Sequence, residues 1–226
     1  MNYPGSSQLR GRIFSILAFG LSLLLWRWAA HQTGSVWPPA ALALAVPALT
    51  LPVVWVGRSS LARDQTAWHA VNVTRIVHFL VGSFLGVALI SAVLAAERLP
   101  WARIPFPGKL ADLLTTISAI AVLFTVLNLA VRGLGAPWAI VLSHRLATDW
   151  LYARTRNPMV FCLIVFLVCF GLRLHSALFL AWVALVFTPA MMLFLHFYEE
   201  RELQIRFGES YVRYRSVTPM FWPRLR

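Results

Sequence analysis

Long apolar segments alternate along the chain with short segments that hold most of the charged residues. Six apolar segments predict membrane-spanning helices, because backbone groups within lipid must find hydrogen-bond partners inside the same segment. They extend approximately over residues 13–30, 39–56, 74–95, 113–131, 159–172 and 177–197. Pro47 and Pro52 predict a kink in the second helix. Only the run from Arg173 to Ser176 joins the last two helices, which predicts an antiparallel helical hairpin.

The composition agrees with a membrane protein. Hydrophobic residues make up 59% of the 226 residues and charged residues 12%, and the mean hydropathy is +0.71. Soluble domains contain about 25% charged residues, so a lipid bilayer is the expected surroundings of this chain. The sequence lacks the alternation of strands and helices that would indicate a doubly wound sheet. We predict an all-α membrane protein of about six transmembrane helices with a C-terminal helical hairpin.

The positive charges predict an orientation in the membrane. A net charge of +12 is typical of nucleic-acid-binding proteins. Here the cations cluster at the ends of apolar segments, so we expect no nucleic-acid partner. With the N-terminus in the cytoplasm, fifteen Lys and Arg residues fall on the cytoplasmic side and five on the other. This asymmetry predicts two cytoplasmic termini. Nineteen of the twenty cations are Arg, which together with abundant Ala and Leu favours a bacterial inner membrane.

The two cysteines predict neither a disulfide nor a metal site. Cys162 and Cys169 lie seven residues apart in one predicted helix. Their Cα atoms would be about 10 Å apart at 1.5 Å per residue, too far for a disulfide bond. Their spacing is not that of metal ligands, and we expect no metal.

Two polar segments indicate that the functional region is the C-terminal part of the chain. Residues 132–158 and 198–226 flank the predicted hairpin, so both are expected at its cytoplasmic end. We therefore predict four N-terminal transmembrane helices over residues 1–131 and a functional region over residues 132–226. The polar segments contain hydrogen-bond donors, carboxylates, aromatic rings and glycines.

Specific strings within these segments resemble a known superfamily. LATDWLYARTRNPMVF, the hairpin and EERELQIRFGESYVRYRSVTPMFWP resemble the isoprenylcysteine carboxyl methyltransferase and phospholipid methyltransferase superfamily of integral membrane methyltransferases. The matching positions before the hairpin are His144, Leu146, Thr148, Tyr152, Arg156, Asn157 and Pro158. Those after it are Glu199, Glu200, Leu203, Phe207, Gly208, Tyr211 and Tyr214. The Gly133-Leu134-Gly135 run resembles the G-x-G element of these enzymes. Trp150 and Val160 depart from the usual Gly and Tyr.

The resemblance implies an S-adenosylmethionine-dependent methyltransferase that acts on a lipophilic or membrane-associated acceptor. It implies a cytoplasmic cofactor site at Gly133, Gly135, His144, Leu146, Tyr152, Arg156, Asn157, Pro158, Glu199 and Glu200. The chemistry of these residues suits the cofactor. Guanidinium and amide groups bind its carboxylate, carboxylates bind its ammonium and sulfonium, and an apolar slot holds its adenine.

Other interpretations stay open. A membrane reductase of the sterol-reductase type would use NADPH, with Arg213 and Arg215 available for the extra phosphate. A membrane scaffold without catalysis is also consistent with the sequence. The glutamate pair Glu199–Glu200 is equally typical of solvated residues at the point where a helix leaves the bilayer. Glu202 and Arg206 have the spacing of an ordinary i, i+4 pair. The sequence does not choose among O-, S- and N-methylation.

Two ionisable residues within the third helix suggest a substrate site. Arg75 and His78 are three residues apart and therefore share a helix face. Ionisable groups inside membranes are often functional, although an arginine also extends to the interface for solvation. We predict a substrate-side role for both residues.

Overall fold

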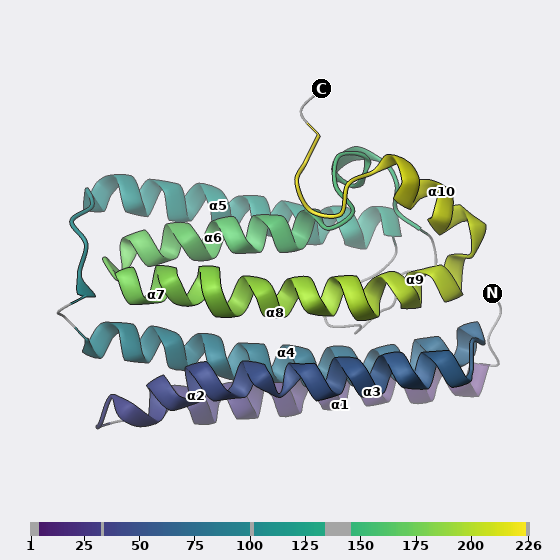
Figure 1. Cartoon of the computed structure of the whole chain (residues 1–226), viewed down its shortest axis with the longest axis horizontal. Helices are drawn as coiled ribbons and strands as arrows, with labels where there is room; N and C mark the ends of the chain where they lie inside the picture. The colour runs from purple at the N-terminus through teal and green to yellow at the C-terminus, as the bar shows by residue number, and fades with distance from the viewer. Residues whose placement is uncertain (1–4, 33, 100–101, 134–145, 225–226) are drawn as a thin grey trace.

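The structure is a computed structural model that describes residues 5–32, 34–99, 102–133 and 146–224, and these residues form a helical bundle (Figure 1). Within these ranges the only pairing of extended backbone is an isolated bridge between Arg103 and Ser176. The prediction of an all-α fold is confirmed for these residues.

The N-terminal half consists of four helical elements. They are α1 (Gly5–Ala30), α2 (Trp37–Ala48), α3 (Thr50–Arg63) and α4 (Ala67–Arg98). The expected kink is a break at Leu49 between α2 and α3. It arises because Pro52 has no N–H to donate to the preceding turn. The Thr66 side chain caps α4 by accepting a hydrogen bond from the His69 N–H at 3.3 Å.

The C-terminal half contains the remaining elements. They are α5 (Gly108–Asn128), the π-helical turn η2 (Leu129–Gly133), the 3₁₀ turn η4 (Trp150–Ala153), α6 (Pro158–Arg173), α7 (Ala177–Trp182), η5 (Val183–Phe187), α8 (Thr188–Leu193), η6 (Phe194–Glu199), α9 (Glu200–Phe207) and α10 (Glu209–Val217). From α7 to α9 they form one continuous helix of 31 residues. The helix therefore continues beyond Phe197, where the predicted membrane span ends, and the glutamate pair lies inside the helix.

Two widened turns interrupt this long helix, and each has a local cause. The π-helical turn η5 precedes Pro189, which lacks the N–H that a regular α-helical turn requires. In the second, η6, the Phe197 carbonyl accepts a hydrogen bond from Nη1 of Arg58 on α3 at 2.7 Å. Turns of this kind occur frequently at functional sites.

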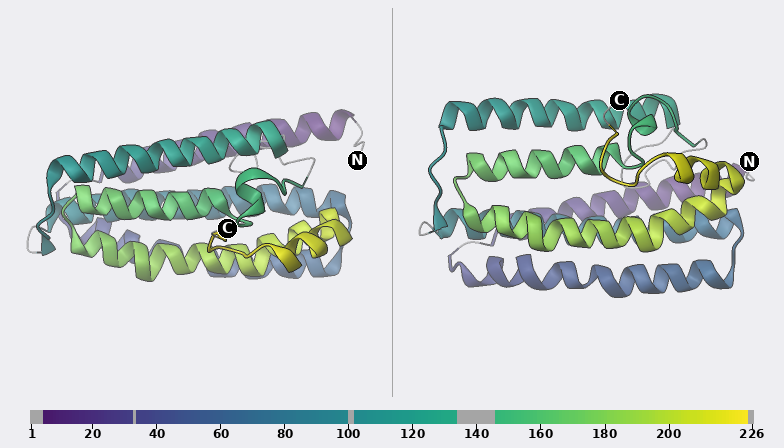
Figure 2. Two further views of the ribbon diagram at one scale, coloured as in Figure 1. Left: turned by 90° about the horizontal axis from the view of Figure 1, so that it is seen from above. Right: turned by 45° about the horizontal axis from the view of Figure 1, so that its top comes forward.

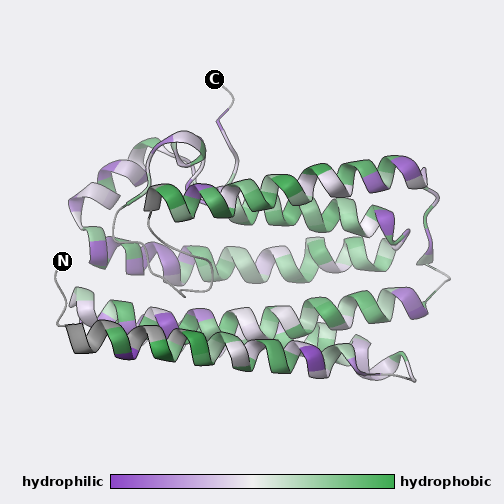
Figure 3. Cartoon of the chain, turned by 180° about the vertical axis from the view of Figure 1, so that it is seen from behind, coloured by the Kyte–Doolittle hydropathy of each residue, from purple (hydrophilic) through white to green (hydrophobic). Residues whose placement is uncertain are grey.

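Among the described residues, four helical runs are long and apolar enough to cross a bilayer. They are Trp37–Arg63, Ala67–Arg98, Gly108–Val131 and Ala177–Phe207. Two shorter apolar helices accompany them, Ile16–Ala30 and Pro158–Arg173. Figure 3 shows hydrophobic residues along the length of these helices and hydrophilic residues mainly towards their ends.

The helices pack as two groups joined by the long C-terminal helix. Helix α4 packs against α1, α2 and α3, whereas α5 packs against α6. The run from α7 to α9 contacts both groups (Figures 1 and 2). The start of α1, the α3–α4 connection, η4 and α10 all lie towards one end of the bundle (Figure 1). Both polar segments therefore reach the same end.

A glycine on α3 permits close helix packing at this end. A Cβ atom at Gly57 would lie 2.7 Å from Cγ2 of Val77 and 2.8 Å from Cε2 of Tyr198. Gly57→Ala is therefore expected to lower the free energy of unfolding by about 1–3 kcal/mol through overpacking.

Gly20→Ala is the matched control, because no atom lies within 4 Å of its added Cβ. It is expected to be neutral or to stabilise α1 by up to about 1 kcal/mol. Unfolding of both variants in the same detergent measures the difference, and equal stabilities would contradict the described packing.

Candidate functional site

A cavity of about 610 Å³ lies between the two helix groups. Its walls come from α4, α5, α6, the long C-terminal helix and α10, with Trp26 contributed by α1. One end is polar and contains side chains from both polar segments. The remainder is lined by apolar residues such as Leu85, Leu89, Val126 and Leu163. This combination suits an amphiphilic ligand or two ligands of different polarity.

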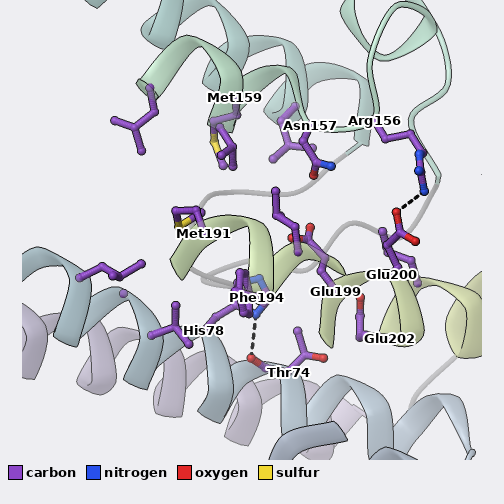
Figure 4. A pocket seen from close by; sticks show the side chains of 18 of the residues that line it. Thr74, His78, Arg156, Asn157, Met159, Met191, Phe194, Glu199, Glu200 and Glu202 are labelled. Atoms are coloured by element: carbon purple, nitrogen blue, oxygen red, sulfur yellow. Dashed lines mark hydrogen bonds and ion pairs between the residues drawn. The ribbon is translucent and has the colours of Figure 1, made fainter. Parts of the chain in front are cut away.

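A buried ion pair forms one wall of the polar end (Figure 4). Nη1 of Arg156 donates to Oε1 of Glu200, and it lies 3.3 Å from the hydroxyl of Tyr211. Both charged side chains are only 11% exposed. Nη1 of Arg215 lies 3.5 Å from the second carboxylate oxygen of Glu200. Glu200 is thus neutralised by two guanidinium groups. The Nε of Arg156 has no partner among the described residues.

The C-terminal tail holds Arg156 in place. The backbone N–H of Arg156 donates to the carbonyl of Pro219 at 2.9 Å. The Asn157 side-chain amide donates to the carbonyl of Met220 at 2.9 Å, and the Thr155 hydroxyl donates to that of Phe221 at 2.9 Å. These bonds join the residues before α6 to the residues after α10, although more than sixty positions separate them in the sequence.

Asn157→Leu tests this connection. The change removes the shorter of two hydrogen bonds that the Met220 carbonyl accepts, the other coming from the Thr155 hydroxyl at 3.2 Å, and costs about 0.5–1.5 kcal/mol. We expect faster amide hydrogen exchange in residues 219–224, measured by mass spectrometry. Asn72→Leu, on α4, is the control for the amide-to-leucine change and should leave the tail protected. Unchanged exchange in Asn157→Leu would contradict the anchoring role.

Three glutamates lie on the cavity wall in different electrostatic states (Figure 4). Glu200 is paired as described above. Glu202 accepts from Nη1 of Arg206 at 2.6 Å, and these side chains are 2% and 8% exposed. The i, i+4 pair predicted from sequence is therefore present, but it is buried rather than solvated. Glu199 has no hydrogen-bond or ion-pair partner among the described residues. Its carboxyl group is therefore available to a ligand, and a bound cation would stabilise its ionised form.

Three tyrosines border the polar end from the loop side and from α10. The Tyr214 hydroxyl donates to the Tyr152 carbonyl at 2.7 Å. Burial raises the pKa of Tyr211 to about 12. Burial also raises the pKa of Tyr152 and of Tyr214 above the ordinary value. All three phenols are therefore neutral at physiological pH, and they offer aromatic faces and hydroxyl groups rather than a base.

Several residues predicted from sequence lie together on the cavity wall. They are Leu146, Tyr152, Arg156, Asn157, Glu199, Glu200 and His78. Pro158 begins α6 as a buried residue and is not on this wall. Arg75 is also absent from the wall, and its Nη1 lies 3.5 Å from Oδ1 of Asn72. Gly133 ends η2, whereas Gly135 and His144 lie outside the described residues.

Other wall residues were not predicted as site residues. Thr74, Glu202 and Arg206 belong to this group, as do Tyr211 and Tyr214. Thr74 lies one helical turn before His78, so the i, i+4 spacing was a usable signal. Glu202 gave no such signal, because its burial depends on the packing of α9 against the distant helix α4. Comparisons with protein families, with curated proteins and with solved structures find no match to this chain.

Proposed function

We propose that this protein is an integral membrane methyltransferase that transfers a methyl group from S-adenosylmethionine to a lipophilic acceptor. The observation that carries the proposal is the unpartnered carboxylate of Glu199 beside the buried Arg156–Glu200 pair, at the polar end of a largely apolar cavity. The sequence resemblance independently assigns Arg156, Asn157, Glu199 and Glu200 to the cofactor site.

The side chains at the polar end suit the donor molecule. Glu199 would bind a cationic group, either the ammonium or the sulfonium. Arg156, with its unused Nε donor, would face the carboxylate, and the neutral tyrosines would border the adenine. The volume of about 610 Å³ falls within the range of about 300–1,000 Å³ for small-molecule sites. The bound donor supplies an electrophilic methyl group, and the protein orients both reactants and excludes water.

The backbone at Trp150 also supports the resemblance. Its φ is 54°, in the left-handed region that favours glycine. The superfamily that the sequence resembles usually has glycine at this position. Trp150 thus keeps a backbone conformation suited to glycine while its side chain packs near Phe124, with the ring centroids 6.4 Å apart.

The electrostatics favour this donor over NADPH. The arginines on the described cavity wall, Arg156 and Arg206, are already paired with Glu200 and Glu202, so they are less available to the phosphate groups of NADPH. Arg215, which the sequence offered for a phosphate, interacts instead with Glu200 at 3.5 Å. A reductase and a scaffold without catalysis are the alternative outcomes of the radiolabel transfer experiment.

The proposed topology has six spans, with both termini and the cofactor site in the cytoplasm of a bacterial cell. Fifteen Lys and Arg residues against five support this orientation. A reporter active only in the cytoplasm, fused after Arg226, is expected to be active. A periplasm-specific reporter fused after Arg173 is expected to be active as well. The reverse pattern at either site would contradict the topology.

Radiolabel transfer tests the proposed activity. Purified protein in lipid nanodiscs would be incubated with methyl-labelled S-adenosylmethionine and a total lipid extract. We expect label in the organic phase that depends on active protein. Donor binding without transfer would indicate a scaffold, and lipid-dependent oxidation of NADPH would indicate a reductase.

A further inference from the structure

A histidine on α4 faces the cavity on the side opposite the Arg156–Glu200 pair (Figure 4). Its Nδ1 lies 3.0 Å from the carbonyl oxygen of Thr74. A carbonyl only accepts hydrogen bonds, so Nδ1 carries the proton and a neutral His78 has its lone pair on Nε2. This Nε2 has no partner among the described residues. Edge contact with Phe194, at a centroid distance of 5.1 Å, fixes the ring.

His78 lies where the polar end meets the apolar part of the cavity. Beyond it, Val81, Leu85 and Leu89 continue along the same face of α4 and line the cavity. Leu89, at the far end of this stripe, is eleven residues from His78, a distance of about 16 Å along a helix at 1.5 Å per residue. The stripe therefore offers an extended apolar wall to a chain whose polar head lies at His78.

The other basic groups of the polar end are already engaged. Glu200 and Glu202 accept from Arg156 and Arg206. The proposed function assigns Glu199 to the cationic donor. Because Arg156 and Arg206 are already paired, a carboxylate acceptor would lack a cationic partner on the described cavity wall, whereas a neutral acceptor needs none. His78 thus supplies a free neutral base beside a site suited to an uncharged head group.

We infer that His78 binds and deprotonates the head group of the acceptor, a single-chain amphiphile with a neutral O–H, S–H or N–H group. This inference rests on the proposed function. The acceptor atom forms a bond to the methyl carbon while the carbon–sulfur bond breaks, and the electron pair of that bond neutralises the sulfonium. The acceptor proton moves to Nε2, and the resulting imidazolium later releases it to water.

Equilibrium binding without the methyl donor tests the head-group site first. The probes are para-dodecylphenol and its methyl ether, para-dodecylanisole, which lacks the donor hydrogen. In nanodiscs the wild-type protein is expected to prefer the phenol by roughly 3–10-fold, the value of one net hydrogen bond. H78N keeps an amide near the Thr74 carbonyl but lacks Nε2, so it is expected to lose the preference.

The matched control is H69N on the same helix. His69 lies outside the cavity and bonds Ser60 at 2.9 Å through Nε2, so this variant should keep the preference for the phenol. No preference in the wild type, or an equal preference in H78N, would overturn the site. H78L has no hydrogen-bond acceptor in its side chain and takes the place of H78N in the binding test if that variant does not fold.

Methyl transfer tests the second half of the inference. With S-adenosylmethionine present, para-dodecylphenol should be methylated, and H78N and H78Q should lose about 10²–10⁴-fold in rate. Their affinity for the methyl donor should change less than threefold, because Glu199 and Arg156 are intact. Three results would overturn the catalytic role of His78. They are variant rates near that of the wild type, faster methylation of dodecanoic acid than of the phenol, and donor binding by the wild type without methylation of the phenol. A phenol preference with no donor binding would instead refute the proposed function and leave the head-group site standing.

Discussion

Replacing Arg156 by methionine is expected to lower the free energy of unfolding by about 3–5 kcal/mol, because the change leaves a buried carboxylate without its close partner. The Glu200 side chain is 11% exposed, and its other cation, Arg215, is more distant and half exposed. The loss also removes the contact with Tyr211. Denaturant titration of the wild-type protein and the variant in the same detergent measures the difference in the free energy of unfolding.

The double variant R156M/E200M distinguishes the net energy of the ion pair from the cost of leaving one buried charge unpaired. Removing both charges should restore most of the stability, because a buried ion pair and an apolar pair of similar volume often have similar net energies. The exposed pair of Arg173 and Asp112 is the control, with an N–O distance of 2.8 Å and side chains 52% and 63% exposed. R173M should cost less than about 1 kcal/mol. A double variant as unstable as R156M would contradict this account.

Glu199→Gln is expected to weaken S-adenosylmethionine binding by about 1.5–3 kcal/mol, the range for a hydrogen bond to a charged group. The variant keeps the shape of the side chain and removes its charge. Because Glu199 has no partner among the described residues, its loss should affect stability less than the loss of Arg156.

S-adenosylhomocysteine indicates which cation Glu199 contacts, since it keeps the ammonium and lacks the sulfonium. Equal losses for both ligands would indicate the ammonium, and a smaller loss for S-adenosylhomocysteine the sulfonium. The control is Glu209→Gln, at the exposed start of α10, which should leave donor affinity unchanged. Unchanged donor affinity in Glu199→Gln would remove this residue from the site.

The sequence predicts much of the fold because membrane helices have a strong local signal. Apolar length and the positions of Pro47 and Pro52 indicated the helices and the break near Leu49. The predicted membrane span ended near Phe197, and the sequence left open whether Glu199 and Glu200 are solvated there. In the structure the helix continues to Phe207, and Arg156, from the segment before α6, pairs with Glu200. The sequence pattern around Glu200 does not reveal a partner that comes from a distant segment of the chain.

The candidate site was partly predictable for a similar reason. The motif residues before α6 and from the end of η6 onward were recognised in sequence, and the structure brings Tyr152, Arg156 and Glu199 to one cavity. The state of each carboxylate depends on contacts between distant segments, so the sequence could not single out Glu199. Likewise, the free Nε2 of His78 follows from its bond to Thr74, which requires the three-dimensional arrangement.

Isothermal titration of the purified protein in nanodiscs with S-adenosylmethionine, and separately with NADPH, tests the central claim most directly. The account predicts saturable binding of S-adenosylmethionine at one site, weakened in Glu199→Gln and unchanged in Glu209→Gln, with no comparable binding of NADPH. Saturable binding of NADPH, or no binding of S-adenosylmethionine by folded protein, would contradict it.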